Sequence, residues 1–393
     1  MKILADENIP FAAEAFATVG EVVLRAGRAI AREDLHDAEV LLVRSITPVN
    51  ADLLQGTPVR FVGTATIGVD HVDLDYLQNS GIAFASAIGC NANSVAEYLI
   101  AALLHWASHQ HIELAGKTLG VVGAGHVGSR VIHKARALGL RVMVNDPPLA
   151  RKFRAEGNIP PFEFLPLPEI LQADFVTLHT PLTCDGSNPT FHLFDAARLR
   201  AMKPAAVLIN TARGPVVDND ALNQALQEQR LAGAILDVWE NEPQPDAELL
   251  ARTHLATPHV AGYSFDGKVQ GTRQIYEALC RFLTILPAWD AAAHLPPPAQ
   301  PMIRAGNSYS NDLEVLQQIV RQAYDIAADD QALRAGFDRV DWTASERSRH
   351  FDQLRRGYPM RREFGNYTVA LRENQFHIAP FLREWGFKTC DAL

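Results

Sequence analysis

The segment 118-TLGVVGAGHVGSRV-131 restricts the possible folds of this chain more than any other stretch. A hydrophobic run ends in glycines with the spacing G-x-G-x-x-G, and a helical pattern follows at once. The first glycine permits a tight turn, the second lets the backbone approach a pyrophosphate, and the third lets helix and strand pack closely. The helix then offers free N–H groups to the phosphates. The predicted phosphate-binding residues are Gly123, Gly125, His126, Val127 and Gly128.

An acidic residue, Asp146, ends the next predicted strand, 18 residues after Gly128. A carboxylate at this place can accept a hydrogen bond from a ribose 2′-hydroxyl and would repel a 2′-phosphate. Two prolines follow it, and the nearest arginine is Arg151. The sequence therefore favours NAD over NADP as the cofactor. The alternative for the whole segment is a glycine turn that binds no ligand, and the strand–turn–helix context argues against it.

Apolar runs alternate with helical patterns along most of the chain, which is typical of a parallel sheet with helices on both faces. Five runs in the first 87 residues are predicted strands: KILAD, EVVLRA, AEVLLVRS, VRFVGTA and IAFASA. Six more follow: KTLGVVG, RVMVND, DFVTLHTP, AVLINTA, AILDVW and HLATPH. Helices are expected at 93–110, where Ser94 and Glu97 stand at capping-box spacing, and at 126–139, 218–233 and 264–286.

The predicted fold class is α/β, with two doubly wound parallel-sheet domains of the Rossmann or flavodoxin-like type and a C-terminal α+β module. A length of 393 residues calls for more than one core. We expect a substrate-binding domain at 1–92 and 265–286 and an NAD-binding domain at 93–264. The C-terminal module is expected at 287–393, after a proline-rich linker.

Charge and composition exclude several classes of protein. The net charge of −9 lacks the basic footprint of a nucleic-acid-binding protein. The four cysteines form no CxxC pair, so the sequence predicts neither a metal cluster nor a disulfide framework. The start MKILADENIP does not resemble a signal peptide, and the longest apolar stretch, 98–107, is too short for a membrane span. We therefore expect a cytoplasmic protein without a membrane partner.

Charged side chains stand where the predicted strands of the second domain end, and ligands bind at the carboxyl ends of strands in this fold. Arg213 presents a planar fork that suits a carboxylate. An imidazole is a common general base in enzymes, so His259 can accept a hydroxyl proton, while Glu242 can hold the imidazole and favour its protonated form. Taken singly, each could be an ordinary surface residue, and their common position at the strand ends favours catalysis.

Two loops of the first domain also follow predicted strands, namely 43-VRSITPVN-50 and 63-GTATIGVDHVD-73. Loops of this kind bind anions well. The small or cationic donors in them are Arg44, Ser45, Thr64 and Thr66. Tyr263, shortly after His259, has a hydroxyl that could reach a substrate or serve only in packing.

Several motifs together resemble the D-isomer-specific 2-hydroxyacid dehydrogenases. They are GAGHVG, the acid at 146, LHTPL, NTARGPVVD, LDVWENEP and TPHVAGYS, and the similarity spans roughly residues 40–285. The resemblance implies that Arg213 binds the substrate carboxylate and that Glu242 and His259 form the acid/base pair. It implies contacts to the nicotinamide cofactor from Thr180, Asp237 and Gly262, and the predicted cofactor site also includes Thr211 and Ala212.

A narrower group, the erythronate-4-phosphate dehydrogenases, is similar to this chain in the stretches MKILADENIP, VRSITPVN, GTATIGVDHVD and RRGYPMRREF. This resemblance implies NAD-dependent oxidation of the 2-hydroxyl of 4-phospho-D-erythronate, in the biosynthesis of pyridoxal 5′-phosphate (vitamin B6). It implies substrate contacts at Ser45, Thr66 and Tyr263. It also implies a homodimer formed through the C-terminal module.

Two questions stay open at the level of sequence. The substrate phosphate needs a cationic partner, either Arg44 or the basic run from Arg347 to Arg362, and the latter could instead be a solvated charged face. The function could also be that of another enzyme of the same fold, such as phosphoglycerate dehydrogenase, or of an NAD-sensing protein similar to the transcriptional corepressors. An intact Arg–Glu–His set is compatible with all three.

Overall fold

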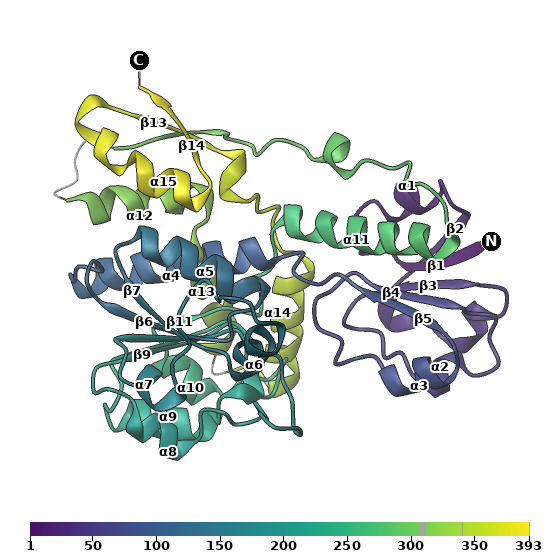
Figure 1. Cartoon of the computed structure of the whole chain (residues 1–393), viewed down its shortest axis with the longest axis horizontal. Helices are drawn as coiled ribbons and strands as arrows, with labels where there is room; N and C mark the ends of the chain where they lie inside the picture. The colour runs from purple at the N-terminus through teal and green to yellow at the C-terminus, as the bar shows by residue number, and fades with distance from the viewer. Residues whose placement is uncertain (307–310, 340, 393) are drawn as a thin grey trace. The chain divides into compact units, whose positions relative to one another are not determined.

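The computed structural model describes residues 1–306, 311–339 and 341–392, and the chain divides into two compact units. The first unit contains Met1–Ala92 and Tyr263–Pro297. The second contains Asn93–Gly262 and the chain from Pro298 onward. Each unit has its own parallel sheet with helices on both faces (Figure 1), which confirms the predicted α/β class.

The first unit is built on a five-stranded parallel sheet in the order β2-β1-β3-β4-β5. The strands are β1 (Lys2–Asp6), β2 (Glu21–Arg25), β3 (Val40–Val43), β4 (Phe61–Thr64) and β5 (Ala83–Ser86). All five coincide with predicted strands. This order is that of flavodoxin-like sheets, in which ligands bind beyond the carboxyl ends of the strands.

Helices cover both faces of this first sheet. Helices α1 (Ala12–Phe16) and α11 (Phe265–Leu283) pack on one face, and α2 (Ala51–Leu54) and α3 (Leu74–Asn79) pack on the other. Short 3-10 turns are η1 (Gly27–Ala29), η2 (Arg32–Leu35) and η4 (Ala291–His294). Helix α11 starts after Ser264, whose hydroxyl accepts a hydrogen bond from the N–H of Gly267. Its predicted apolar face is buried at Ile275 and Leu279, while Phe282 is 39% exposed.

The second unit contains a six-stranded parallel sheet in the order β11-β10-β9-β8-β6-β7. The strands are β6 (Thr118–Val122), β7 (Arg141–Asn145), β8 (Phe175–Leu178), β9 (Val207–Asn210), β10 (Gly233–Leu236) and β11 (Leu255–Ala256). They are the six predicted strands. A single parallel bridge between Val144 and Phe164 extends the sheet beyond β7. With that bridge counted, the first six positions follow the Rossmann order 3-2-1-4-5-6.

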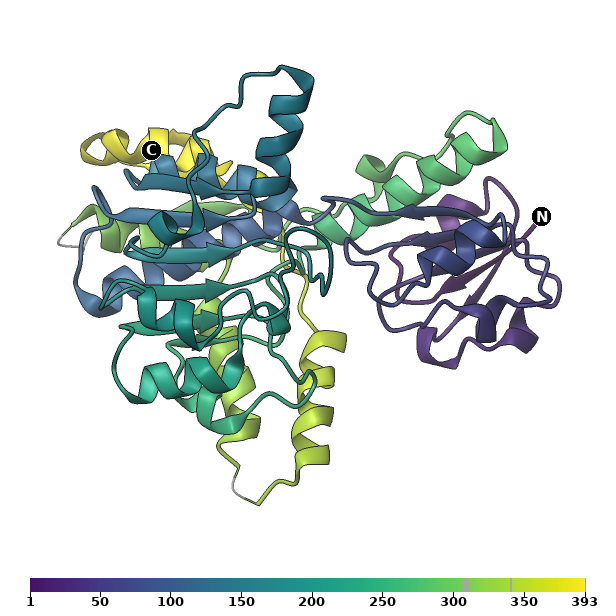
Figure 2. The same cartoon turned by 60° about the horizontal axis from the view of Figure 1, so that its bottom comes forward.

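Helices lie on both faces of this second sheet (Figure 2), and a hydrophobic cluster is buried on each face. Helices α4 (Ala92–Gln110) and α5 (His126–Ala137) contribute to one cluster. The other contains side chains from α7 (Leu167–Ile170), α8 (Ala196–Ala201), α9 (Asn219–Gln227) and α10 (Ala247–Arg252). Helix α6 (Pro147–Glu156) follows β7, and η3 (Gly214–Val216) follows β9.

Two helical predictions need correction. Helix α4 begins at Ala92, so Ser94 lies within its first turn and does not cap it. The Ser94 hydroxyl donates a hydrogen bond to Glu363, and buried Glu97 accepts one from the backbone N–H of Phe364. The helix predicted at 218–233 ends at Gln227, because the chain turns there to enter β10 and Gln229 has a left-handed φ of 54°.

The C-terminal segment forms a three-stranded parallel sheet in the order β12-β13-β14. Its elements are β12 (Met302–Arg304), α12 (Asp312–Ala323), α13 (Ile326–Phe337), α14 (Ala344–Arg356), η5 (Phe364–Asn366), β13 (Thr368–Leu371), η6 (Glu373–Ile378), α15 (Ala379–Trp385) and β14 (Lys388–Asp391). Helix α15 packs on α5, where the indole N–H of Trp385 donates to the carbonyl of Lys134. Of the helices that the structure describes, none combines the length and the hydrophobicity needed to cross a membrane.

Candidate active site

The carboxyl ends of the parallel strands in the second sheet lie at one edge, and most of the predicted site residues follow them. These residues are Gly123 to Gly128 after β6, Asp146 after β7, Thr180 after β8, Thr211 to Arg213 after β9, Asp237 to Glu242 after β10, and His259 to Gly262 after β11. The fold thus gathers at one sheet edge residues that are far apart in the sequence.

The glycine loop combines two crowded positions with an open one. Gly123 has a φ of 90°, and a Cβ there would lie 2.7 Å from the carbonyl oxygen of His179. A Cβ at Gly128 would lie 1.9 Å from the carbonyl oxygen of Gly123, whereas a Cβ at Gly125 would meet no described atom within 4 Å. Helix α5 begins directly after Gly125 without a side-chain cap. The loop therefore exposes backbone N–H groups and leaves room for a phosphate beside Gly125.

Asp146 joins the end of β7 to this loop. One carboxylate oxygen accepts a hydrogen bond of 2.9 Å from the N–H of Ala124, and the other accepts one of 2.9 Å from Leu149 and thereby caps α6. Both oxygens keep further acceptor capacity. Nearby, the buried hydroxyl of Thr180 has no hydrogen-bond partner among the described residues. The open glycine, the uncapped helix and this unpartnered hydroxyl fit a dinucleotide cofactor.

His259 and Glu242 form the central contact of the site. Nδ1 of His259 lies 2.7 Å from Oε2 of Glu242, while Oε1 of Glu242 accepts a hydrogen bond of 3.0 Å from the N–H of Trp239. The acid therefore fixes the imidazole ring and leaves Nε2 for other partners. The two side chains are 30% and 21% exposed, so a small molecule can reach them.

The charge state of Glu242 suits this contact. Burial acts to raise its pKa, but the His259 charge, the hydrogen bond to the imidazole, the Arg355 charge and the Trp239 N–H together lower the pKa below the usual 4.5. The group is therefore a carboxylate at neutral pH. A carboxylate at Nδ1 stabilises an imidazolium, which is the state that a general base reaches after it accepts a proton.

The backbone of His259 is held in an unusual conformation by Asp237. His259 has a left-handed φ of 58°, and its N–H donates to the carbonyl of Asp237 at 2.7 Å. The buried carboxylate of Asp237 accepts hydrogen bonds from the N–H groups of Val260 and Ala261 and from the hydroxyl of Thr257. Burial raises its pKa. Asp237 thus shapes the loop of His259, and its predicted contact with the cofactor stays a prediction.

Arg213 follows β9 beside this loop. Its Nη1 donates to the carbonyl of Ala212 at 2.7 Å, and the amide of Asn210 donates to the carbonyl of Arg213 at 2.9 Å. A Cβ at Gly214 would lie 1.9 Å from the carbonyl oxygen of Trp239. Gly214 therefore lets the segment that carries Arg213 lie against the segment that carries Glu242.

Thr211 and His179 lie next to each other, directly after the carboxyl ends of β9 and β8. The Thr211 hydroxyl lies 3.3 Å from Nδ1 of His179, and Thr177 lies 3.0 Å from Nε2. Burial lowers the pKa of His179 to about 3, so its ring is neutral. Both ring nitrogens of His179 contact threonine hydroxyls, whereas the contact of His259 with Glu242 involves only Nδ1, and this difference separates the two histidines.

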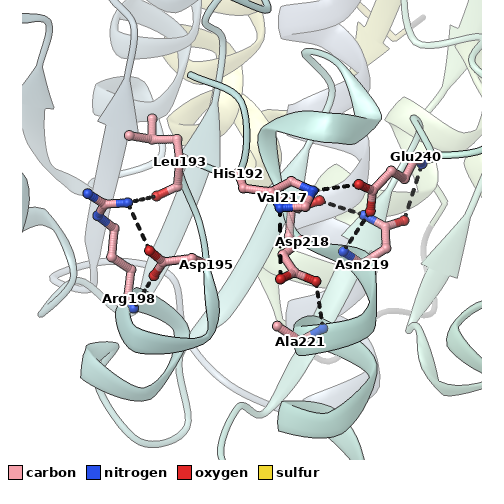
Figure 3. Close-up of polar contacts among 9 residues, drawn as sticks. All are labelled: His192, Leu193, Asp195, Arg198, Val217, Asp218, Asn219, Ala221 and Glu240. Carbon is pink, nitrogen blue, oxygen red and sulfur yellow. Dashed lines mark hydrogen bonds and ion pairs between the residues drawn. The ribbon is translucent and has the colours of Figure 1, made fainter. Parts of the chain in front are cut away.

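A second histidine–acid contact, which we did not predict from the sequence, lies close to Glu242 in the chain. Nε2 of His192 lies 2.5 Å from Oε1 of Glu240, whose other oxygen accepts a hydrogen bond of 3.1 Å from the N–H of Asn219. Figure 3 shows how these three residues lie. His192 has a left-handed φ of 47° and its N–H donates to the carbonyl of Pro215. This contact ties the loop after β8 to the segments after β9 and β10. No motif in the sequence marks it.

The predicted substrate residues Ser45, Thr66 and Tyr263 lie in the first unit. Ser45 is exposed after β3, and the hydroxyl of Thr66 bonds to Thr64 at 2.9 Å and to the carbonyl of Gly68 at 3.1 Å. The ring of Tyr263 carries the ammonium of Lys268 4.5 Å above its centroid. These contacts order the loops, and the role of the three residues toward a substrate stays a prediction.

The basic run from Arg347 to Arg362 is not simply a solvated face, and that alternative is wrong for its last two arginines. Arg361 and Arg362 are only 6% and 3% exposed. Arg361 donates to the carbonyls of Ser94 and Ala261 at 2.7 and 3.0 Å and lies 4.1 Å over the ring of Tyr324. Its guanidinium is engaged inside the second unit and does not face solvent.

Comparison with known proteins places this geometry in a family context. Residues 97–261 match the NAD-binding domain of the D-isomer specific 2-hydroxyacid dehydrogenases, which confirms NAD as the predicted cofactor, and residues 294–382 match a domain of unknown function, DUF3410. The erythronate-4-phosphate dehydrogenase of Salinibacter ruber is 47% identical, over 94% of both chains. That of Pseudomonas syringae pv. syringae is 46% identical, over 98% of this chain and 99% of its own.

A solved structure supports the same relationship. The NAD-dependent formate dehydrogenase of Staphylococcus aureus in complex with NAD is 25% identical. The match has a TM-score of 0.59 and covers 74% of this chain and 98% of that one.

Proposed function

Because the chain belongs to the erythronate-4-phosphate dehydrogenase family, we propose that it oxidises 4-phospho-D-erythronate to (R)-3-hydroxy-2-oxo-4-phosphooxybutanoate with NAD. This reaction would serve the biosynthesis of pyridoxal 5′-phosphate. The observation that carries the proposal is the contact of 2.7 Å between His259 and Glu242, at the same sheet edge as the glycine loop.

NAD supplies the acceptor for the hydride that leaves C2 of the substrate. Nε2 of His259 accepts the proton of the C2 hydroxyl, and Glu242 stabilises the imidazolium that results. The guanidinium of Arg213 holds the substrate carboxylate and polarises the developing carbonyl. Positioning of the substrate supplies most of the acceleration, since the protein forms no covalent bond to it.

The cofactor contacts that we propose are those predicted from the sequence. The pyrophosphate binds to the backbone from Gly123 to Gly128, with His126 and Val127 at the start of α5, and the ribose hydroxyls bind to Asp146. Residues proposed near the nicotinamide are Thr180, Thr211, Ala212, Asp237 and Gly262. The unpartnered Thr180 hydroxyl supports its place in this set.

Replacement of the imidazole tests the assignment directly. His259→Gln should lower kcat by about 10²- to 10⁴-fold if the residue is the general base. Binding of NAD, followed by fluorescence, should stay within about twofold, since the glycine loop is untouched. A near-normal rate of NADH formation would refute the role of His259.

A substrate panel tests the identity of the acid that is oxidised. Purified protein should form NADH with 4-phosphoerythronate and much more slowly with 3-phosphoglycerate. Faster turnover of 3-phosphoglycerate would assign the chain to another dehydrogenase of this fold. The absence of turnover with any phosphorylated hydroxy acid, together with tight NAD binding, would point to a sensing role instead.

Two alternative partners are proposed for the substrate phosphate. One is Arg44, which directly follows β3 in the first unit. The other is the basic run, in which Arg355 on α14 is the member whose charge lowers the pKa of Glu242. The true partner should raise KM for the phosphorylated substrate when it is replaced, in Arg44→Ala or in Arg355→Ala, and unchanged KM values in both would reject this assignment.

We also propose that the chain is a homodimer joined through its C-terminal segment and works in the cytoplasm, with four reduced cysteines. Support comes from the family resemblance and from the four free thiols, Cys90, Cys184, Cys280 and Cys390. Light scattering of the full chain should give twice the mass of 43.2 kDa. A monomer at assay concentration would refute the dimer.

A further inference from the structure

Three histidines lie together in the second unit, away from the strand ends that carry the candidate active site. His105 and His109 stand four residues apart on α4, and His254 directly precedes β11. His259 follows β11, so the cluster belongs to the opposite edge of the sheet. One ring nitrogen from each of the three side chains lies within 4.8 Å of the other two.

The imidazoles are prepared to act as ligands. Nδ1 of His109 donates to the carbonyl of His105 at 3.1 Å, which leaves the lone pair on Nε2. Nε2 of His254 is buried and has no hydrogen-bond partner among the described residues. An unpartnered buried ring nitrogen is costly for a fold, and coordination of a cation would satisfy it.

The surroundings do not repel a cation. Arg321 and Arg334 lie near the cluster, but each is paired with an aspartate. The Nε of Arg321 donates to Asp325 at 2.9 Å, and the Nε of Arg334 donates to both oxygens of Asp330 at 2.9 Å. The positive charges are thus offset locally.

An acidic side chain lies beside two of the three histidines. His105, His109 and Asp325 line one cavity of about 260 Å³. Oδ1 of Asp325 is buried without a hydrogen-bond partner in the described part of the chain. Its negative charge favours a cation bound to the neighbouring imidazoles.

We propose that His105, His109 and His254 bind one divalent transition-metal ion of the zinc type, with water in the fourth position and the charge of Asp325 nearby. Three imidazoles form a donor set that zinc favours in tetrahedral sites with an open fourth position. In such a site the nitrogens lie about 3.4 Å apart, given metal–nitrogen distances of about 2.0–2.1 Å. The ring nitrogens, all within 4.8 Å of one another, must therefore approach by at most about 1.4 Å, which side-chain rotation can supply.

Calorimetric titration of the tag-free full-length chain with zinc sulfate, after removal of metals by a chelator, tests the proposal. The wild-type chain should bind one Zn²⁺, and its melting temperature should rise with added zinc. His109→Gln and His254→Ala should each weaken binding by about tenfold or more. His109 is exposed, so its variant keeps the test valid if His254→Ala fails to fold. Cobalt should give the intense visible absorption of a tetrahedral site.

The matched control is His111→Gln, because His111 lies just beyond the same helix, is exposed and is not part of the cluster. Its zinc affinity should stay within about twofold of the wild type. A wild-type chain without zinc affinity, ligand variants that bind as tightly as the wild type, or an equal loss in His111→Gln would each overturn the site. Unchanged affinity in Asp325→Asn would remove the charge of Asp325 from the proposal.

Discussion

Substitution of Gly214 tests whether backbone packing, and not only the reactive side chains, sets the rate. A Cβ at this position would lie 1.9 Å from the carbonyl oxygen and 2.0 Å from the carbonyl carbon of Trp239, and 2.5 Å from the nitrogen of Glu240. Ordinary contacts begin at 3.4 Å. In Gly214→Ala the segment of Arg213 or the segment of Glu242 must therefore move by about 1.5 Å, because both neighbours are rigid backbone.

The expected effect on turnover follows from that displacement. A misplacement of about 1 Å in a catalytic site can lower the rate by about 10²-fold, so we expect at least that loss of kcat in Gly214→Ala. Overpacking should also lower the free energy of unfolding by about 1–3 kcal/mol. NADH formation at saturating substrates and a urea denaturation curve measure the two effects separately.

Gly365→Ala is the matched control for this experiment. Gly365 is exposed, and a Cβ there would meet only the carbonyl oxygen of Gly386 at 3.6 Å. Its kcat and denaturation midpoint should equal those of the wild type. The reasoning would be refuted if Gly214→Ala kept a wild-type kcat, or if only its KM for NAD changed.

Four further substitutions, at three positions, have defined outcomes. Glu242→Gln should lower kcat by about 10²-fold. The pKa of Glu242 in the folded state lies below 4.5, so the stability that its carboxylate contributes is present above pH 4.5 and should disappear as the pH falls below that value. The urea denaturation midpoints of the wild type and the variant should therefore converge at low pH. Asp146→Ala should lower the free energy of unfolding by about 1 kcal/mol, because it removes the N-cap of α6. Asp146→Asn keeps the cap and should only relax the preference for NAD over NADP, measured as the ratio of the kcat/KM values for the two cofactors. His192→Ala should reduce kcat by several-fold through the loop that Glu240 holds, with substrate KM unchanged; an unaltered kcat would deny the contact a positioning role.

Sequence patterns were sufficient to predict both large sheets. Parallel strands buried on both faces appear as continuous apolar runs, and all of β1 to β11 coincide with such runs. Boundaries were less predictable where a turn competes with helix propensity, as at Gln229, whose left-handed φ ends the helix earlier than its periodicity suggests. The spacing of Ser94 and Glu97 misled for a different reason, because a distant segment around Glu363 uses both side chains.

The candidate site was predictable only in part. The strand-end positions of Arg213, Glu242 and His259 follow from the chain order, since parallel strands deliver their carboxyl ends to one edge. Other contacts depend on how separate loops lie in space. They are the hydrogen bonds that Asp237 accepts from the backbone after His259, and the contact of His192 with Glu240. The four-residue spacing of His105 and His109 was visible in the sequence, but His254 comes from another element and gave no signal.

The C-terminal signature RRGYPMRREF acquires a physical meaning from the contacts of Arg361. Its guanidinium bonds to the carbonyl of Ala261, two residues after His259, and to that of Ser94 in the first turn of α4. Close by, the N–H of Phe364 donates a hydrogen bond to Glu97. Burial, followed by the charge of Glu363, raises the pKa of Glu97 to about 8. Replacement of this buried arginine would remove one hydrogen bond from each of the two carbonyls. The C-terminal segment therefore holds the loop that carries the proposed general base, through the contact of Arg361 with Ala261. This contact gives the segment a role in the site that does not require its side chains to touch the substrate.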